Sequence, residues 1–353
     1  MIKDKSILIK NIYYMLSYAF QTIHFKQYEN IEIEEFDNIH NLFSAILSRG
    51  ISYQLKQGLY KEYVSKKEDL PLMRGKINVQ GTIKNRLSRK QLLSCEYDEL
   101  SENNLLNQII KTTSVLLIRH SKVDSKYKDE LKKEMLFFQK VDTLEPKSIR
   151  WSTIVFQRNN QNYRILISIC QLVIQGMLLT TEKGQYKLLS FIKPEQMHKL
   201  YEKFLLEYFA QTFPNLSVKA SQIPWALDDN VGTLLPIMQT DITIEKDNKV
   251  LIIDAKYYTK TMQVQFDKAT IRSNHLYQIF TYVKNKEYSF DNKEHIVSGM
   301  LLYAKTDEVV QPDNTFRIHD NEITVKNLDL NQDFSKISES LNSIVKKYFD
   351  VNY

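Results

Sequence analysis

Two aspartates and a lysine in the second half of the sequence form its clearest chemical pattern. In the stretch 238–258, two β-branched segments flank Lys-Asp-Asn-Lys, a sequence typical of a hairpin turn. With the tip at 247–248, Asp241 lies directly opposite Asp254. Lys256, two residues further on, projects from the same face because side chains alternate along a strand.

Facing carboxylates repel each other and weaken a hairpin unless something compensates them. Mg²⁺ does this well, since it binds one or two protein carboxylates together with water and phosphate oxygens. Lys256 beside such an ion could hold or activate a water, or neutralise charge developing on a phosphate. The simpler alternative is a solvated strand face on which Asp254 and Lys256 merely pair. We favour the ion, because Asp241 stands opposite and Val-Leu-Ile-Ile buries the strand that carries the other two residues.

A helix predicted from about 273 to 284 adds two polar side chains. Gln278 and Tyr282 are four residues apart and share one face. Glutamine can hydrogen-bond a phosphate or position a neighbour, and tyrosine can stack or donate a proton; equally, both suit an ordinary amphipathic helix. The preceding loop, 257–272, interleaves basic and aromatic residues, which suits a nucleic-acid backbone. The sequence has no glycine-rich phosphate loop, so we do not expect the chain itself to hydrolyse a nucleotide.

The elements around these residues predict an α/β domain with a central mixed sheet. A helix begins at Pro194, a residue that suits a first helical turn, and carries Glu202 and Glu207 at the margins of its apolar stripe. The other predicted elements are strands at 216–222, 296–303 and 315–325 and a closing amphipathic helix at 334–349.

The N-terminal part is predicted to be mainly helical with a small β element. Helical spacing covers 7–19, 41–63, 101–120, 122–140 and 160–179, and short strands are expected at 70–79 and 92–100. Asn11 is a candidate N-cap. Arg74-Gly75-Lys76 stands at a bend, where Arg74 and Lys76 could contact an anionic partner or simply be solvated. A turn-rich stretch at 180–193 then predicts domains at 1–185 and 186–353.

Composition is that of a soluble protein with two domains. The 353 residues are 43% hydrophobic and 25% charged, and the net charge of +6 is compatible with a polyanionic partner. Cys95 and Cys170 lie far apart, which argues against disulfides or a zinc site and indicates a reducing compartment. Apolar runs stay short of the roughly 18 residues of a membrane span, and no signal peptide is apparent. We therefore expect a cytoplasmic protein without membrane contact.

Together these motifs resemble a known pattern. Asp on one strand, Asp-Ala-Lys on the next and Gln-x-x-x-Tyr on a helix resemble the restriction-endonuclease-like PD-(D/E)xK core in its RecB-type variant. Most of the chain resembles the McrC family, the nuclease subunits of McrBC restriction systems. The segments that carry this resemblance are Asn11-Ile-Tyr-Tyr-Met-Leu-Ser-Tyr-Ala, Arg74-Gly-Lys, Asn107-Gln-Ile-Ile-Lys, Leu200-Tyr-Glu-Lys-Phe-Leu, Thr240-Asp-Ile-Thr-Ile and Leu251-Ile-Ile-Asp-Ala-Lys-Tyr-Tyr.

The resemblance implies a restriction-endonuclease-like domain at 186–353 that cuts double-stranded DNA with Mg²⁺, and an N-terminal domain at 1–185 that docks into a ring of the AAA+ GTPase McrB. In this family McrB recognises DNA with modified cytosine, and McrC stimulates its GTPase and cuts. Carried over by position, the family's site falls on Asp241 and Asp254 as metal ligands, Lys256 as catalytic lysine and Gln278 as support. The helix acid that completes the metal site is Glu202, or alternatively Glu207. Thr240 replaces the family's name-giving proline, which should not matter because the carboxylate does the chemistry.

Two other functions remain open. The chain could be a non-cleaving activator or adaptor with a nuclease-like scaffold, although a decayed site has no reason to keep a destabilising carboxylate pair. It could also be a stand-alone RecB-like repair nuclease. The large helical N-terminal part, which has no helicase motif, fits partner docking better.

Overall fold

The structure is a computed structural model that describes residues 3–4, 7–19, 34, 36–157, 160, 162–183, 194–229, 232–258, 262–265, 268–290, 294–306, 308 and 311–349. The chain forms two compact units, Met1–Leu42 with Gln175–Tyr353, and Phe43–Ile174. We call them the sheet unit and the helical unit. The division predicted at 185/186 lies near the second border, but residues 1–42 group with the C-terminal part of the chain.

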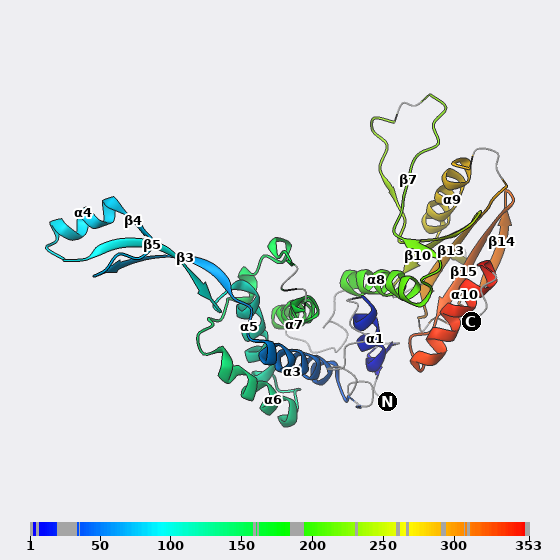
Figure 1. Cartoon of the computed structure of the whole chain (residues 1–353). Coiled ribbons are helices and arrows are strands. Elements are labelled where there is room, and N and C mark those ends of the chain that lie inside the picture. Colours follow the sequence, from blue (N-terminus) through cyan, green and yellow to red (C-terminus); the bar gives the residue numbers. More distant parts are fainter. Residues whose placement is uncertain are drawn as a thin grey trace. The chain divides into compact units, whose positions relative to one another are not determined.

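A six-stranded mixed sheet forms the centre of the sheet unit (Figure 1). Its order is β14 (Asn314–Ile318), β15 (Asn321–Leu328), β13 (Ile296–Ala304), β10 (Lys249–Lys256), β9 (Ile242–Lys246) and β6 (Ser217–Lys219). Strands β10, β13 and β15 are parallel, and the remaining pairs are antiparallel. The apolar run of β10 lies inside the sheet because a strand buried on both faces needs a continuous hydrophobic sequence. The predicted α/β fold with a central mixed sheet is confirmed.

The stretch 315–325, predicted as one strand, is a hairpin instead. Strands β14 and β15 are joined through His319 and Asp320, whose φ angles are 47° and 67°. Two successive residues in the left-handed region reverse the chain tightly. The turn escapes notice in the sequence because neither residue is glycine or asparagine.

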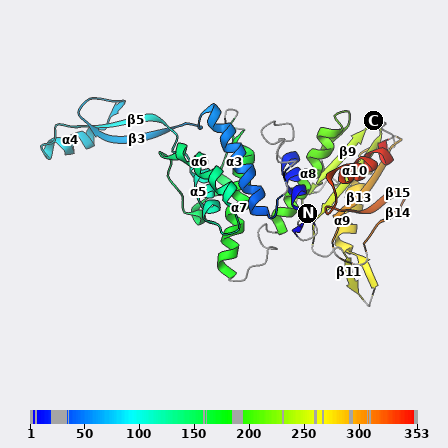
Figure 2. The same cartoon turned by 90° about the horizontal axis from the view of Figure 1, so that it is seen from below.

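Helices cover both faces of this sheet (Figures 1 and 2). Helix α9 (Ser273–Tyr288) packs on one face, where a Cβ added to Gly299 would come within 2.9 Å of Ile279 and Val283. Helix α10 (Phe334–Phe349) packs on the other face through Tyr348 and Thr324, whose hydroxyls are 2.7 Å apart. Helix α8 (Pro194–Thr212) lies beside α10, and the predicted bounds of α10 are confirmed.

Helix α1 (Ile9–Ala19) packs against α8, which explains why the N-terminal residues belong to this unit. The N-cap prediction for Asn11 is wrong. Asn11 lies within the helix, and its buried side chain donates to the carbonyls of Leu330 and Gln332, both at 2.8 Å. The helix begins at Ile9, and the Asn11 side chain makes long-range hydrogen bonds instead of a local capping bond.

Three short ribbons complete the sheet unit. They are β1 (Lys3–Asp4) with β2 (Ile7–Leu8), β7 (Gln222–Ile223) with β8 (Met238–Gln239), and β11 (Met262–Gln265) with β12 (Lys268–Ile271). The last ribbon lies within the stretch 257–272 that the sequence indicated only as a basic loop.

The helical unit contains helices α3 (Ile39–Gln57), α5 (Leu105–Arg119), α6 (Ser125–Met135) and α7 (Tyr163–Lys183), and the short 3₁₀ segments η2 (Leu136–Phe138), η3 (Pro146–Ser148) and η4 (Trp151–Thr153). Helix α3 begins before the unit's first border and α7 ends after its second. The predicted mainly helical part with a small β element is confirmed. No helix in the described ranges has the length and apolarity to cross a membrane.

A β-ribbon extends from these helices (Figures 1 and 2). We call residues 62–101 the arm. It consists of β3 (Glu62–Leu70), β4 (Lys76–Ile77), α4 (Val79–Leu87) and β5 (Leu93–Ser101). The helix predicted for 41–63 ends at Gln57, and β3 was missed. Its sequence, Glu-Tyr-Val-Ser-Lys-Lys-Glu-Asp-Leu, has no apolar alternation, so pairing with β5 along its whole length decides its conformation.

Candidate active site

The central hairpin has the register that the sequence predicts. Ile253 pairs with Ile242 and Leu251 with Ile244, and Asp247 at the tip has a φ of 54°. Asp241 stands just beyond the last pair of this ladder. Its Oδ2 accepts a hydrogen bond from the amide of Ala255 at 2.8 Å, which brings the carboxylate next to the end of β10.

Asp254 and Lys256 form a buried ion pair on the face of the sheet that α9 covers. Lys256 Nζ lies 2.7 Å from Asp254 Oδ2, and only 8% and 3% of the two side chains are exposed. The ammonium also donates to Gln278 Oε1 at 3.2 Å, and Gln278 Nε2 donates to Tyr282 Oη at 3.0 Å. The structure therefore brings together Asp241, Asp254, Lys256 and Gln278, four of the predicted site residues.

Burial and charge shift the protonation of this pair. Burial, together with the Asp241 carboxylate, raises the pKa of Asp254 to about 7, against the opposing effect of the Lys256 ammonium. Burial alone would lower the pKa of Lys256, but the charge and hydrogen bond of Asp254 outweigh it, so that pKa is raised. Lys256 therefore carries its proton at neutral pH, whereas Asp254 is poised between its two forms.

Two acids on α8, Glu202 and Glu207, were the alternatives for the third metal ligand. The charge of Asp241 acts on Glu202. Burial raises its pKa to about 7, and the charge of Asp241 adds to the rise. His198 Nε2 lies 3.0 Å from its Oε1. Glu207 instead accepts from Gln211 Nε2 at 3.3 Å, and the same amide nitrogen donates to the carbonyl of Tyr18 in α1. The two largest charge effects on Glu202 come from Asp241 and Lys256, which periodicity alone could not show.

Among the described residues, no three His, Cys, Asp or Glu side chains gather closely enough to hold a metal ion by themselves. What the site offers is a pair of adjoining carboxylates. Within the described ranges, the buried Oδ2 of Asp254 has the Lys256 ammonium as its partner, at 2.7 Å. Two adjoining carboxylates therefore share one ammonium, and an additional cation would relieve the repulsion that remains between them.

Two aromatic neighbours of the site, Tyr258 and His275, were not among the predicted site residues. The ring of Tyr258 stacks on His275 at 5.2 Å and lies 5.8 Å from His198. His275 Nδ1 is 2.7 Å from Tyr303 Oη, and burial lowers the pKa of His275 to about 4, so it stays neutral. The available signal was spacing: position 275 precedes Gln278 by three residues and therefore shares its helical face.

The two predicted partner-contact residues belong to the arm, in the helical unit. The Arg74 guanidinium lies 3.9 Å from the centre of the Tyr97 ring and 3.5 Å from Glu99. The predicted bend is present at Gly75, where φ is 68° and a Cβ would lie 2.4 Å from the Glu96 carbonyl oxygen. Lys76 follows as an exposed residue of β4.

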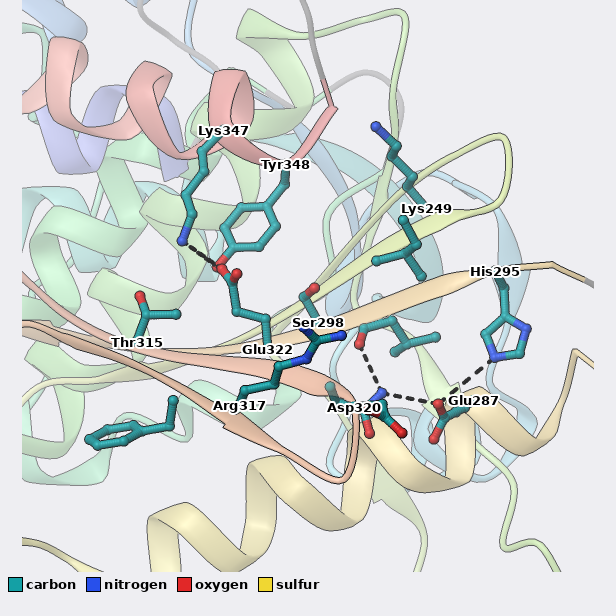
Figure 3. A pocket seen from close by; sticks show the side chains of 14 residues that line it. Lys249, Glu287, His295, Ser298, Thr315, Arg317, Asp320, Glu322, Lys347 and Tyr348 are labelled. Atoms are coloured by element: carbon teal, nitrogen blue, oxygen red, sulfur yellow. Dashed lines mark hydrogen bonds and ion pairs between the residues drawn. The ribbon is translucent and has the colours of Figure 1, made fainter.

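A pocket with a volume of about 650 Å³ opens at the opposite end of the sheet, where β10 begins at Lys249 (Figure 3). Its two glutamates already have partners. Glu322 is bonded to Lys347 at 2.5 Å, and Glu287 accepts from Asn321 at 3.1 Å. None of the predicted site residues lines this pocket, so the end of β10 remains the candidate active site.

Comparison with known proteins shows the family of the chain. The profile of the family described as "McrBC 5-methylcytosine restriction system component" matches residues 3–304. The chain is 29% identical over 347 residues to the Escherichia coli K12 protein "Type IV methyl-directed restriction enzyme EcoKMcrBC", covering 97% of this chain and 98% of that protein.

Among solved structures, a chain of the "half-complex from tetradecameric assembly of Thermococcus gammatolerans McrB AAA+ hexamers with bound McrC" has a similar fold. The likeness covers 95% of this chain and 76% of that one, with a TM-score of 0.54 and 19% identity. Since the family profile spans most of the sequence, the chain belongs to the McrBC 5-methylcytosine restriction system component family.

Proposed function

We propose that this chain is the DNA-cutting subunit of a GTP-dependent restriction complex, with a restriction-endonuclease-like fold in its sheet unit. It would hydrolyse phosphodiesters in double-stranded DNA that carries modified cytosine. The observation that carries the proposal is the gathering of Asp241, Asp254, Lys256 and Gln278 at the end of β10, in a chain of this family.

The donor set fits Mg²⁺. That ion is bound through one or two carboxylates and keeps waters and substrate phosphate oxygens as its remaining ligands. Asp241 and Asp254 would hold it, with Glu202 as the third candidate ligand, and the repulsion between the two adjoining aspartates, which raises the pKa of Asp254, supports this assignment. Bound there, Mg²⁺ would supply positive charge to the phosphate and lower the pKa of a water.

Lys256 would act as an electrostatic group rather than as a base. Its raised pKa keeps the ammonium protonated at neutral pH, so it cannot accept a proton from water. Its charge instead suits the negative charge that develops on a phosphate during displacement. Gln278 has a positioning part, because its Oε1 holds the ammonium while Tyr282 holds its amide nitrogen.

The partner would be a ring of an McrB-like AAA+ GTPase. The solved relative consists of McrB AAA+ hexamers with bound McrC. On this chain, the arm presents a surface suited to docking, because large apolar side chains are exposed close to basic ones. Clusters of this kind mark interaction sites on soluble proteins. The apolar residues are Leu72, Met73, Val79, Ile83 and Leu87, with exposures between 52% and 82%, and the basic ones include Arg74 and Lys76.

Reconstitution tests the nuclease proposal. The chain is mixed with an McrB-like ring, GTP, Mg²⁺ and a cytosine-methylated plasmid, and linearisation and GTP hydrolysis are followed together. Asp254→Asn should remove cutting and leave GTPase stimulation intact. Asp98→Asn, an exposed acid of the arm, serves as the matched control and should cut normally. Cutting by Asp254→Asn at the unchanged rate would refute the site.

A second experiment tests docking by the arm. Ile83→Ser with Leu87→Ser should weaken binding of the ring and the stimulation of its GTPase, because both side chains are exposed on α4. The matched control is Leu136→Ser with Phe137→Ser, a pair that is 65% exposed at each position in η2 of the same unit. Equal loss in both double variants would argue against the arm as the docking surface.

The non-cleaving adaptor is distinguished by the same assays. An adaptor would stimulate the GTPase of the ring without cutting, so the wild-type chain would leave the methylated plasmid intact under conditions in which GTP hydrolysis is accelerated. The stand-alone repair nuclease would cut without the ring, and the apolar surface of α4 would have no role in it.

A further inference from the structure

The two ends of the arm meet in one buried hydrogen-bond network. The chain enters the arm after Tyr60 and leaves it at Glu102. Asn107 Nδ2 donates to both carbonyls, at 2.9 Å to Tyr60 and 2.8 Å to Glu102. Asn104 Nδ2 also donates to the Tyr60 carbonyl at 2.8 Å, and the Asn104 amide donates to that of Glu102 at 2.9 Å. Two asparagines at the start of α5 thus hold both roots of the ribbon.

Helix α7 contributes the remaining partner. Tyr163 Oη accepts from the Tyr60 amide and donates to Asn107 Oδ1, both at 2.9 Å. Burial raises the pKa of Tyr163 to about 12, so the hydroxyl keeps the proton that it donates. Asn107 is fully buried and Tyr163 is 1% exposed, which means that each lost bond would leave a buried group without a partner.

A small movement at the roots of the arm becomes a large movement at its tip. Nine strand residues at about 3.3 Å each make the ribbon roughly 30 Å long, while its two strands are about 4.8 Å apart. About 1 Å of slack between the roots therefore rotates the ribbon by roughly 12° and moves its tip by about 6 Å. A displacement of that size takes the apolar side chains of α4 out of register with any docked surface.

We infer that Asn107 and Tyr163 are positioning residues for partner engagement: they clamp both roots of the arm and so hold its tip ready for docking. The inference rests on the proposed partner function. It also accounts for the segment Asn107-Gln-Ile-Ile-Lys, which the sequence singled out and which no part of the catalytic assignment uses. A pre-oriented arm binds more tightly because less conformational freedom is lost on docking.

The test uses the full chain with Tyr163→Phe, which removes only the hydroxyl and keeps the ring packed. Asn107→Ala is the second variant. The matched control, Tyr97→Phe, removes the bond from Tyr97 Oη to Glu68 at 2.6 Å in the middle of the arm. Spin labels at Lys84→Cys in α4 and Lys132→Cys in α6 report the arm's orientation by pulsed electron paramagnetic resonance. The native cysteines are buried and should not react.

Two results are expected from Tyr163→Phe. The distance distribution between the labels broadens by several ångströms, and the concentration of chain that half-saturates GTPase stimulation rises about three- to tenfold. The maximal stimulated rate stays unchanged, since a docked arm presents the same tip. An inactive fraction of the sample would also raise the half-saturating concentration, so the folded fraction of each variant is checked by circular dichroism before the titration. Tyr97→Phe should match the wild type in both measurements.

An unchanged distance distribution would overturn the inference, and so would a broadened one with unchanged half-saturation. If the wild-type chain fails to stimulate the ring at all, the proposed partner function falls and the functional half of the inference falls with it. The label distances then still decide whether the network holds the arm.

Discussion

The arm and the central hairpin are both antiparallel ribbons in which carboxylates stand beside lysines, yet their electrostatics are opposite. In the arm, hydrogen bonds from Lys66 and Lys67 lower the pKa of Glu99 and Glu96. In the hairpin, burial raises the pKa of Asp254 to about 7 despite its own lysine.

Exposure accounts for the difference. The lysines of the two arm pairs are 41% and 70% exposed, so water solvates each charge before and after pairing and the pairs contribute little to stability. The Asp254–Lys256 pair is almost fully withdrawn from water, so desolvation dominates. The comparison teaches that an Asp–Lys motif signals chemistry only where the fold buries it, because a buried pair needs a reason other than stability.

The largest expected effect is on DNA cutting, when the buried lysine of the hairpin is compared with an exposed lysine of the arm. Lys256→Met is expected to reduce plasmid cutting by the reconstituted complex about 10²- to 10³-fold, the loss typical of a charge that stabilises a transition state. Lys66→Met should leave the cutting rate within about twofold, because Lys66 is an exposed residue of the arm. Comparable losses in the two variants would break the distinction between the ribbons.

Stability should separate the same two variants. Removing one partner of a buried ion pair costs about 3–5 kcal/mol, so Lys256→Met should lower the free energy of unfolding in urea by about that much at pH 8. The loss should shrink at pH 5, where Asp254 takes up a proton and leaves no buried charge behind. Lys66→Met should give no measurable change. A loss that is the same at both pH values would contradict the raised pKa.

Mg²⁺ should stabilise the hairpin site in a pH-dependent way. Asp254 binds protons more tightly when folded, so the stability from its protonated form is complete below about pH 4 and is lost as pH rises through about 7. At pH 8 a cation can replace the proton. With a Kd of about 1 mM, 10 mM Mg²⁺ adds about 1.4 kcal/mol, or about 3 °C in Tm. The shift should vanish at pH 5 and in Asp241→Asn, as measured by calorimetry.

The smallest expected effect is that of salt on the carboxyl pKa values, and it should be clear only in the arm. At low ionic strength, carboxyl NMR signals of Glu96 and Glu99 should titrate below the ordinary value of 4.5. Raising NaCl to about 0.5 M should move them back toward it, because exposed charges are screened. The pKa of Asp254 should change much less with NaCl, because screening by salt is weak for a buried charge. A salt-sensitive Asp254 would mean that the pair is open to solvent.

Much of the sheet unit could be predicted from the sequence where local chemistry is decisive. The hairpin register followed from its turn and its alternation, and helix α10 followed from a clear 3.6-residue period. Where a prediction from the sequence was wrong, a contact with a distant segment of the chain determined the local structure. Strand β3 forms because it pairs with β5. The Asn11 side chain is buried because it donates hydrogen bonds to the carbonyls of Leu330 and Gln332.

The sequence by itself determined which side chains could do chemistry and which of them share a strand or helix face. Side-chain period and turn type are local properties of the backbone, and they suffice to bring Asp241 next to Asp254. Only the tertiary structure decided that Asp254 and Lys256 are buried, that the charge of Asp241 acts on Glu202, and that Asn107 bonds both roots of the arm. Burial and long-range hydrogen bonds depend on segments far apart in the chain, and no local pattern records them.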